Sequence, residues 1–299
     1  MAKAKNANVM GLDERALLVK LSIGAWSGRV TDKEVSRKVA ADHEATNDAG
    51  YFRKQLFGKE ALNEIQKLAG AARTAHYSLT LPWTDDGSRI ITTESYDHYT
   101  KVMRDYRRKI KDAVEEFLDK YDEHVKQSKK RLGKLFKAED YPPRDVVRSK
   151  FTFDVEPMPV PTARDFRAKV SDAEANAIAK DIERRTQERL EQAMRDVYER
   201  IAEVTGKMVE KLDSYKPREG LRSAEGLFRD SLVGNIRKLA ETLPYLNITK
   251  DPALDKLQKE LLDNLCAYEP DDLRTDAKAR ALTAKKAKAI HDKVSAFLG

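Results

Sequence analysis

Two unusually long amphipathic segments constrain the fold of this chain more than any other feature. Within residues 95–137, apolar side chains recur at alternating spacings of three and four, as one face of an α-helix requires. They are Tyr96, Tyr99, Met103, Tyr106, Ile110, Ala113, Phe117, Tyr121, Val125 and Leu132. At ~1.5 Å per residue such a helix is roughly 60 Å long. An ordinary globular core does not cover that length, so we expect a partner of similar length.

The second segment, residues 171–214, supplies a candidate partner. Its apolar stripe comprises Ala175, Ile178, Ile182, Leu190, Ala193, Val197, Ile201, Val204, Met208 and Leu212. Ser171 and Glu174 form a capping box at its start, and Pro217 and Gly220 follow its end. The heptad-like spacing favours coiled-coil packing of the two helices as an antiparallel hairpin. We predict that its buried seam contains Tyr106, Ile110, Phe117, Tyr121, Ile182, Val197 and Ile201.

The region before the first long helix, residues 1–94, combines helical and strand patterns. Residues 77–92 alternate apolar and polar side chains on both sides of an Asp-Asp-Gly turn, which predicts a β-hairpin. Residues 17–23 also alternate, but the charged residues before them could equally begin a helix, so both readings stay open. Thr31 and Glu34 form a capping box that opens a short helix, and a further helix is predicted over residues 59–75.

The remaining segments are shorter. An extended connector over residues 138–170 contains a candidate strand at 150–156, which could join the hairpin. Residues 216–299 form a helical region with helices at about 223–242, from Pro252 to Leu265, and 271–297. Asp251 and Pro252 have the cap and first-position signature of the second of these helices. The first of these is expected to stop before Pro244. The predicted fold is therefore mainly α, with a long antiparallel coiled-coil-like hairpin over 95–215, a small β-hairpin or sheet, and a C-terminal helical bundle.

Composition restricts the cellular setting. Charged residues make up 36% of the chain, and Cys266 stands alone, so no disulfide within the chain is expected and a reducing cytosol is favoured. No apolar run approaches the ~20 residues that span a bilayer. The start, Met-Ala-Lys-Ala-Lys-Asn, has no apolar segment after it, so no signal peptide is predicted. We expect a protein of the bacterial host cytoplasm with no membrane partner.

Motifs for catalysis are weak. Gly58-Lys59 resembles the end of a phosphate loop, but Arg53 stands where glycine is required and Glu60 replaces the magnesium-binding hydroxyl. The five histidines are scattered, so no metal site is predicted. Asp85 and Asp86, with His76, could serve an enzyme, but a turn beside a glycine explains the two carboxylates more simply. We predict no catalytic, cofactor-binding or metal-binding residues and no enzymatic activity.

Two basic runs are candidate contacts for nucleic acid. The first closes the first long helix and contains Lys126, Lys129, Lys130, Arg131, Lys134 and Lys137. The second lies on the last helix and contains Lys278, Arg280, Lys285, Lys286, Lys288 and Lys293. The net charge of +7 permits attraction to phosphates. Cations at a helix end and on a solvated face have a simpler role in stability and solubility, and the last helix has no aromatic stacking partners among its lysines.

Two motifs carry a resemblance to a known family. One is Leu21-Ser22-Ile23-Gly24-Ala25-Trp26-Ser27-Gly28-Arg29 followed by Asp32-Lys33-Glu34-Val35. The other is Ala72-Arg73-Thr74-Ala75-His76-Tyr77-Ser78-Leu79-Thr80-Leu81-Pro82-Trp83 followed by Asp86-Gly87-Ser88-Arg89-Ile90. With the helix from Tyr96, they resemble an uncharacterised family of bacteriophage and plasmid proteins, over roughly residues 12–215. Members tend to be encoded near a MoxR-type ATPase and a von Willebrand-type protein resembling a cobalt-chelatase subunit, which implies cooperation with an ATPase assembly.

Two functions from different classes follow. The first is a non-enzymatic, self-associating structural or adaptor protein of a phage or plasmid, expected as a homo-oligomer, with the MoxR-type ATPase or the von Willebrand-type protein as a possible partner. The alternative is a nucleic-acid-binding protein that uses basic helical faces. Neither function requires a cofactor.

Overall fold

The computed structural model describes residues 11–162, 171–218 and 225–299, so residues 1–10 and the two short internal gaps lie outside the described structure. The chain divides into two compact units. The first unit, which we call the helical unit, contains residues 1–20, 77–99 and 156–299. The second, which we call the basic unit for a reason given below, contains residues 21–76 and 100–155.

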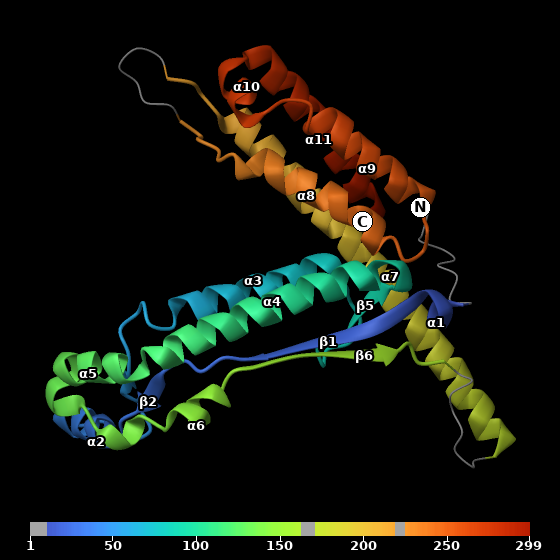
Figure 1. The fold of residues 1–299 in the computed structure, drawn as a ribbon. Helices are drawn as coiled ribbons and strands as arrows, with labels where there is room; N and C mark the ends of the chain where they lie inside the picture. The colour runs from blue at the N-terminus through green and yellow to red at the C-terminus, as the bar shows by residue number, and fades with distance from the viewer. Residues whose placement is uncertain (1–10, 163–170, 219–224) are drawn as a thin grey trace. The chain divides into compact units, whose positions relative to one another are not determined.

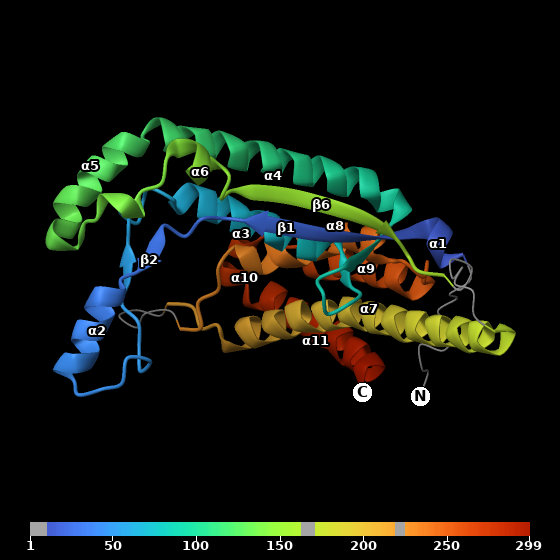
Figure 2. The ribbon, with the colours of Figure 1, turned by 90° about the horizontal axis from the view of Figure 1, so that it is seen from below.

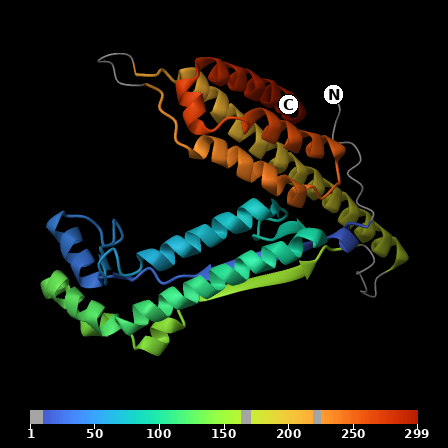
Figure 3. The same cartoon turned by 45° about the horizontal axis from the view of Figure 1, so that its top comes forward.

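The helical unit is built along α7 (Asp172–Ser214). Helices α8 (Ser231–Leu246), α9 (Pro252–Leu265) and α11 (Ala277–Leu298) line its C-terminal part (Figures 1 and 3), and α7 packs most extensively against α11. The short α10 (Pro270–Thr275) precedes α11. The core contains α7 residues from Leu190 to Leu212 together with leucine and isoleucine side chains from α8, α9 and α11.

Local sequence sets the ends of these helices. The Ser171 side chain accepts a hydrogen bond from the backbone N–H of Glu174, and Asp251 accepts one from Ala253, so both predicted caps are confirmed. Helix α8 begins at Ser231 and continues through Pro244, so the expected stop before this proline is wrong. The proline lies in the last turn, so few helical hydrogen bonds follow it. The predicted last helix is two helices, because the side chain of Asp276 caps a new one.

A small antiparallel sheet has the strand order β4-β5-β1-β6. Strands β4 (Leu81–Pro82) and β5 (Arg89–Thr92) form a hairpin that is shorter than predicted, because residues 77–79 are helical. Strand β1 (Ala16–Gly24) pairs with β5 from Ala16 opposite Thr92 to Val19 opposite Arg89. Residues 17–23 are therefore a strand, preceded by the short α1 (Leu12–Arg15). The predicted strand at 150–156 exists as β6 (Thr152–Pro159), but it joins the sheet beside β1, not beside the hairpin.

The basic unit contains a second, two-stranded sheet and several helices. Strands β2 (Arg29–Thr31) and β3 (Arg53–Gln55) pair with each other antiparallel. Helix α2 (Lys33–Asp42) lies between them in the sequence. The capping residue of α2 is Asp32, one position after the predicted Thr31. Most of α3 (Asn63–Leu79) and of α4 (Thr93–Asp119) belongs to this unit, as do α5 (Tyr121–Leu132), the 3-10 turns η1 (Gly133–Leu135) and η2 (Ala138–Asp140), and α6 (Arg144–Arg148).

The two long segments differ from the expected hairpin in their partners. The first is interrupted at Lys120, where α4 ends and α5 begins, although the buried stripe continues from Phe117 to Tyr121. The second, α7, packs against α11 and α8. An apolar stripe shows which face of a helix is buried but not which helix covers it, and here the C-terminal helices cover α7. The mainly helical class, the small sheet and the C-terminal helical group agree with the sequence.

Within the described ranges, no helix combines the length and the apolar character that crossing a membrane requires.

Candidate functional site

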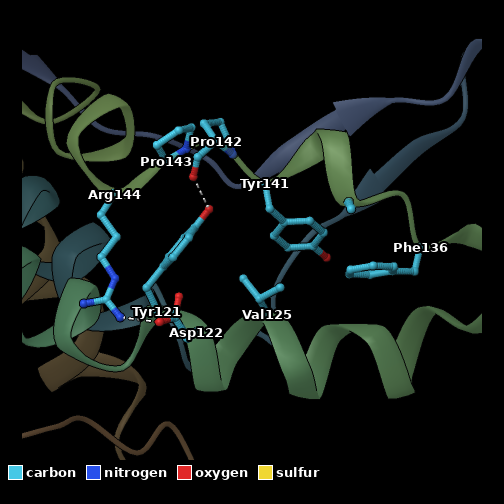
Figure 4. Close-up of a pocket in the computed structure, with 9 residues that line it drawn as sticks. Tyr121, Asp122, Val125, Phe136, Tyr141, Pro142, Pro143 and Arg144 are labelled. Atoms are coloured by element: carbon cyan, nitrogen blue, oxygen red, sulfur yellow. Dashed lines mark hydrogen bonds and ion pairs between the residues drawn. The ribbon is translucent and has the colours of Figure 1, made fainter.

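The basic unit holds a surface pocket of about 410 Å³ between α5 and the chain that follows it (Figure 4). Tyr121 and Val125 lie one turn apart on α5 and therefore share a face of the helix. The opposite side is the segment from Phe136 to Arg144, where two consecutive prolines hold the backbone extended. The lining residues are Tyr121, Asp122, Val125, Phe136, Ala138, Tyr141, Pro142, Pro143 and Arg144.

Polar groups in this pocket are already engaged. The Tyr121 hydroxyl donates a hydrogen bond of 2.8 Å to the carbonyl oxygen of Pro142, and the Tyr141 hydroxyl donates one of 2.9 Å to that of Leu56. Burial raises the pKa of Tyr121 to about 12 and also raises the pKa of Tyr141, so both remain neutral donors near pH 7. Asp122 and Arg144 form an ion pair of 2.5 Å at the rim. The walls of the pocket are therefore apolar and fixed in position.

An aromatic cluster behind the pocket holds these walls in place. The Phe57 ring lies at its centre, with ring centroids 5.4 Å from Phe117, 5.9 Å from Tyr121 and 5.6 Å from Tyr141. Trp26, in the first motif that carried the family resemblance, contacts the same ring at 5.5 Å. Edge-to-face pairs of this kind stabilise by about 0.5–1.5 kcal/mol beyond the area that they bury. The cluster joins the end of α4, α5 and the segment after it to the loop that follows β3.

A buried ion cluster includes Asp140, which belongs to the segment from Phe136 to Arg144. The Lys54 ammonium group is 3.2 Å from a carboxylate oxygen of Asp32 and 2.7 Å from one of Asp140, and it also donates to the carbonyl oxygen of Leu135. The side chains of Lys54 and Asp32 are only 1% and 3% exposed. The hydrogen bond from Val35 and those from Lys54 lower the pKa of Asp32. The two carboxylates outweigh desolvation and raise the pKa of Lys54. No sequence pattern indicated this cluster, because its members lie far apart along the chain.

The first predicted basic run lies on α5 and η1, close to the pocket. Lys129 lies with its ammonium group 6.0 Å from the centroid of the Phe136 ring. Arg131 donates a hydrogen bond to the carbonyl oxygen of Gln55, so it has a structural role. Lys126, Lys130 and Lys134 are exposed and form no ion pair with any residue that the structure describes. These three, with Lys129, remain available for an external anion.

The second predicted basic run lies on α11 in the helical unit. Lys285 is exposed and Lys286 is half-buried, whereas Lys288 pairs with Asp292 at 3.2 Å and Lys293 with Glu260 at 3.1 Å. Arg280 donates to the carbonyl oxygen of Leu273. The structure therefore assigns the two runs to different units and supplies neighbouring carboxylates to part of the second.

The predicted seam residues fall into two groups with separate partners. Phe117, Ile110 and Tyr121 are buried in the basic unit, and Tyr106 is half-buried. Val197 and Ile201 are fully buried in the core of the helical unit, whereas Ile182 is half-buried. Phe117 contacts Phe57 and stacks on His124, both of the basic unit.

Sequence reasoning missed the distribution of charge between the units. Residues 21–76 and 100–155 contain 25 Lys or Arg against 18 Asp or Glu, whereas the remaining residues contain 32 of each. The entire net charge of +7 thus belongs to the basic unit, which gives it its name. Part of this excess of positive charge lies on α4, where residues 101–111 contain six basic residues and a single acidic one, Asp105.

The two aspartates that an enzyme could have used lie in the turn of the hairpin. One carboxylate oxygen of Asp86 accepts hydrogen bonds from the Thr84 hydroxyl and from the backbone N–H of Ser88, and the other accepts from Lys20 at 3.3 Å. These bonds, with the Thr84 contact first, hold the pKa of Asp86 far below its usual range. Asp85 is exposed. The turn accounts for both residues. Within the described ranges no three His, Cys, Asp or Glu side chains come together as metal ligands would.

Comparison with known proteins identifies the family but not an activity. The model of DUF3150, described as a protein of unknown function, matches residues 13–217, and the chain belongs to this family. The chain matches no curated protein and no solved structure. The family match ends just after α7, so helices α8 and α11, which pack against α7, lie beyond it.

Proposed function

We propose that this protein is a non-catalytic, self-associating adaptor of a phage or plasmid. The observation that carries the proposal is the N-terminal part of α7. Residues 172–185, about four turns of helix, contribute no side chain to the core, whose α7 members begin at Leu190. In Figures 1 and 2 this part of α7 extends beyond α8, α9 and α11. An amphipathic helix whose apolar face the described residues leave partly exposed is suited to pairing with another helix.

Residues 172–185 have the properties of a self-complementary interface. Ala175, Ile178, Ala179 and Ile182 lie on one face and are half-buried within the monomer. The two alanines allow close approach of a second helix. Arg184 and Arg185 near its end pair with Asp181 on the same helix, so charge does not select the partner. A second copy is proposed as the occupant because it presents the same apolar face, and one patch on both partners is the geometry of a two-fold dimer.

Association through this segment is expected to be weak. Four turns extend only about 21 Å, so the interface falls below the ~1,200 Å² that stable complexes bury. A dimer that dissociates on dilution is therefore the expected state. Such a dimer suits an adaptor whose assembly is completed by another protein.

The test replaces the apolar face and measures mass in solution. The double substitution Ile178→Lys and Ile182→Lys should give a monomer at every concentration, whereas the unaltered chain should show a rising mass in light scattering over a micromolar to millimolar series. Ala173→Lys with Ala177→Lys adds the same charge on the exposed opposite face and should leave the mass unchanged. A strictly monomeric unaltered chain would refute self-association.

The adaptor part of the proposal concerns a MoxR-type ATPase and a von Willebrand-type protein. Its support is the resemblance of the two sequence motifs to proteins encoded beside such genes. Co-purification of the untagged chain with either tagged partner, in the presence and absence of ATP, is the direct measurement. Failure to co-purify with both would separate the chain from the ATPase assembly without affecting self-association.

A second candidate function is nucleic-acid binding through the basic unit. The specific observation in its favour is that this unit holds the whole excess of positive charge, including a basic stretch on α4 and four exposed lysines near α5. Binding of this kind releases counterions and therefore weakens steeply with salt. Fluorescence anisotropy with labelled DNA at 25 and 200 mM salt tests it, and no binding at the lower concentration excludes it.

A further inference from the structure

We infer that the pocket between α5 and residues 136–144 binds an unpaired base of a single-stranded nucleic acid, while the lysines of α5 contact the neighbouring phosphates. The inference rests on the second candidate function and assigns it a site. Single-strand-binding proteins combine aromatic platforms for the bases with a cationic path for the backbone. Both parts are present here on one element and the chain that follows it.

The aromatic part is the wall of the pocket. Phe136 and Tyr141 stack with ring centroids 5.1 Å apart and planes inclined by 26°, and both rings are half-buried. Figure 4 shows Tyr121 on the other side of the pocket and Val125 on α5 between the rings. Because the tyrosine hydroxyls bond to backbone carbonyl groups, the rings are held in place before any ligand arrives. A flat apolar group can enter this space without any ordering of the walls.

The cationic part lies along the rim. Lys129 follows Val125 by one turn, and its contact with the Phe136 ring places its ammonium group beside the pocket. Lys126 and Lys130 continue the cationic surface around α5, with no ion pair to any described residue. Arg144 marks the other end of the pocket, where it pairs with Asp122. A base in the pocket therefore has cations available for the phosphates on its flanks.

The same contacts predict that the site does not distinguish one base from another. Reading the identity of a base requires free donors and acceptors directed at its edges. Both hydroxyls here are bonded to the protein, and the only charged lining groups, Asp122 and Arg144, are paired with each other. Stacking is tolerant of sequence because every base has a π-face. The expected ligand is therefore any single strand, DNA or RNA, with little preference for sequence.

An aromatic groove also suits a proline-rich peptide. The charge on the rim and the net charge of the unit favour a polyanion, because such a peptide needs no cations. The peptide is therefore an outcome of the experiment below and not a second proposal.

The experiment compares ligands and leaves the protein unaltered. Anisotropy is measured on the full chain at low salt with a labelled 12-nucleotide thymine strand, an adenine strand, the matching RNA, and a strand of the same length that lacks bases. Stacking of one base contributes roughly 5- to 150-fold to affinity, so the strand without bases should bind at least five-fold more weakly. The thymine and adenine strands should bind within a few-fold of each other.

Substitutions then locate the site. Phe136→Leu keeps an apolar side chain but removes the ring, and it should reduce affinity for the thymine strand about five-fold or more without affecting the strand that lacks bases. Phe52→Leu, at an exposed aromatic residue of the same unit that does not line the pocket, is the matched control. Lys129→Gln should weaken both strands and reduce the salt slope by about 0.7, whereas Lys59→Gln, at another exposed lysine of this unit, should do neither.

The outcomes distinguish a base-binding pocket from charge-driven binding by the basic unit. Equal binding of strands with and without bases, lost steeply with salt, would overturn the base pocket and leave the charge-driven function standing. Absence of binding to every strand would overturn both. Competition of the thymine strand by a polyproline peptide at the same site, with no discrimination against the strand that lacks bases, would instead assign the pocket to peptides.

Discussion

Lys54 joins three segments of the basic unit that are far apart in the sequence. It lies in β3 and contacts Asp32 at the start of α2 and Asp140 in η2. Removing one partner of a buried ion pair costs more than the pair contributes, because the remaining charges stay buried without compensation. Two carboxylates would be left in that condition here.

Lys54→Met should therefore reduce the free energy of unfolding by about 3–5 kcal/mol at pH 7. The cost should shrink towards pH 4, because protonation of Asp32 removes a buried charge that has lost its partner. Urea titrations at both pH values provide the measurement. Lys59→Met is the control, since Lys59 is exposed and an effect below about 0.5 kcal/mol is expected there. Equal costs for the two variants would mean that the ion cluster does not stabilise the unit.

The pH window of this cluster follows from the two pKa directions. The pKa of Asp32 is lowered in the folded state, so its stabilisation is present above the unfolded value of about 3.9 and is lost as the pH falls through the folded value. The pKa of Lys54 is raised, so its stabilisation is present below about 10.4 and is lost as the pH rises through the folded value. The cluster therefore stabilises the unit most between about pH 4 and pH 10.

Residue patterns predicted local features better than distant ones. Ser171, Asp251 and the turn at Asp86 act through neighbours within a few positions, and the sequence identified all three. The cap of α2 was misplaced by one residue, because Thr31 and Asp32 both have suitable side chains and only the backbone decides between them. The ion cluster and the pocket were missed, because both depend on how residues 133–144 turn back towards β3 and α5.

Among elements, α7 and α11 form the most extensive contact between two helices of the helical unit. Gly206 of α7 faces His291 of α11, and a Cβ atom at position 206 would lie 3.0 Å from Cε1 of that ring. The ring is held by a hydrogen bond of 3.0 Å from its Nδ1 to the carbonyl oxygen of Ala202. The glycine thus allows the histidine to pack against the α7 backbone.

Gly206→Val should destabilise the protein by about 1–3 kcal/mol, the usual cost of overpacking, although glycine is a poor helix former. Gly234→Ala is the matched control: a Cβ atom there meets nothing within 4 Å, so the exchange should stabilise by about 0.5–1 kcal/mol. Thermal unfolding of both variants tests the pair. A stabilising Gly206→Val would show that the two helices can separate at this point without cost.

The sequence did not determine which helix packs against which. The stripes of residues 95–137 and 171–214 indicated correctly that each helix buries one face, and Phe117, Val197 and Ile201 are buried as expected. Apolar stripes are chemically alike, however, so several pairings satisfy them equally. The apolar stripe of α11 is a weaker sequence signal, because small alanines form much of its buried face, including Ala284 and Ala287.

At the scale of the whole molecule, the residues that match the family are expected to depend on the C-terminal helices for folding. The match stops at residue 217, yet α8 and α11 pack against α7, and the core that α7 enters from Leu190 to Leu212 also includes side chains of α9. A chain that ends at 217 should expose this face and aggregate or unfold without cooperativity, because a contiguous apolar surface of this size is unstable in water. Sedimentation and near-ultraviolet circular dichroism would show it.

Co-expression of residues 218–299 should rescue the shortened chain by covering the same face. If the chain ending at 217 were soluble and cooperatively folded on its own, the C-terminal helices would be an addition to a self-sufficient fold.

The composition of the helical unit also sets the order in which the molecule can fold during its synthesis. The ribosome completes all residues of the basic unit by position 155, so that unit can fold while the rest is still being made. The helical unit draws on the chain before residue 21 and on α11, close to the other end. Strand β4, which contacts α7, is made before it, but α8 and α11 follow it in the chain. Helix α7 therefore leaves the ribosome before α11, its main partner, and in that interval we expect chaperones that hold exposed apolar helices to bind the nascent chain.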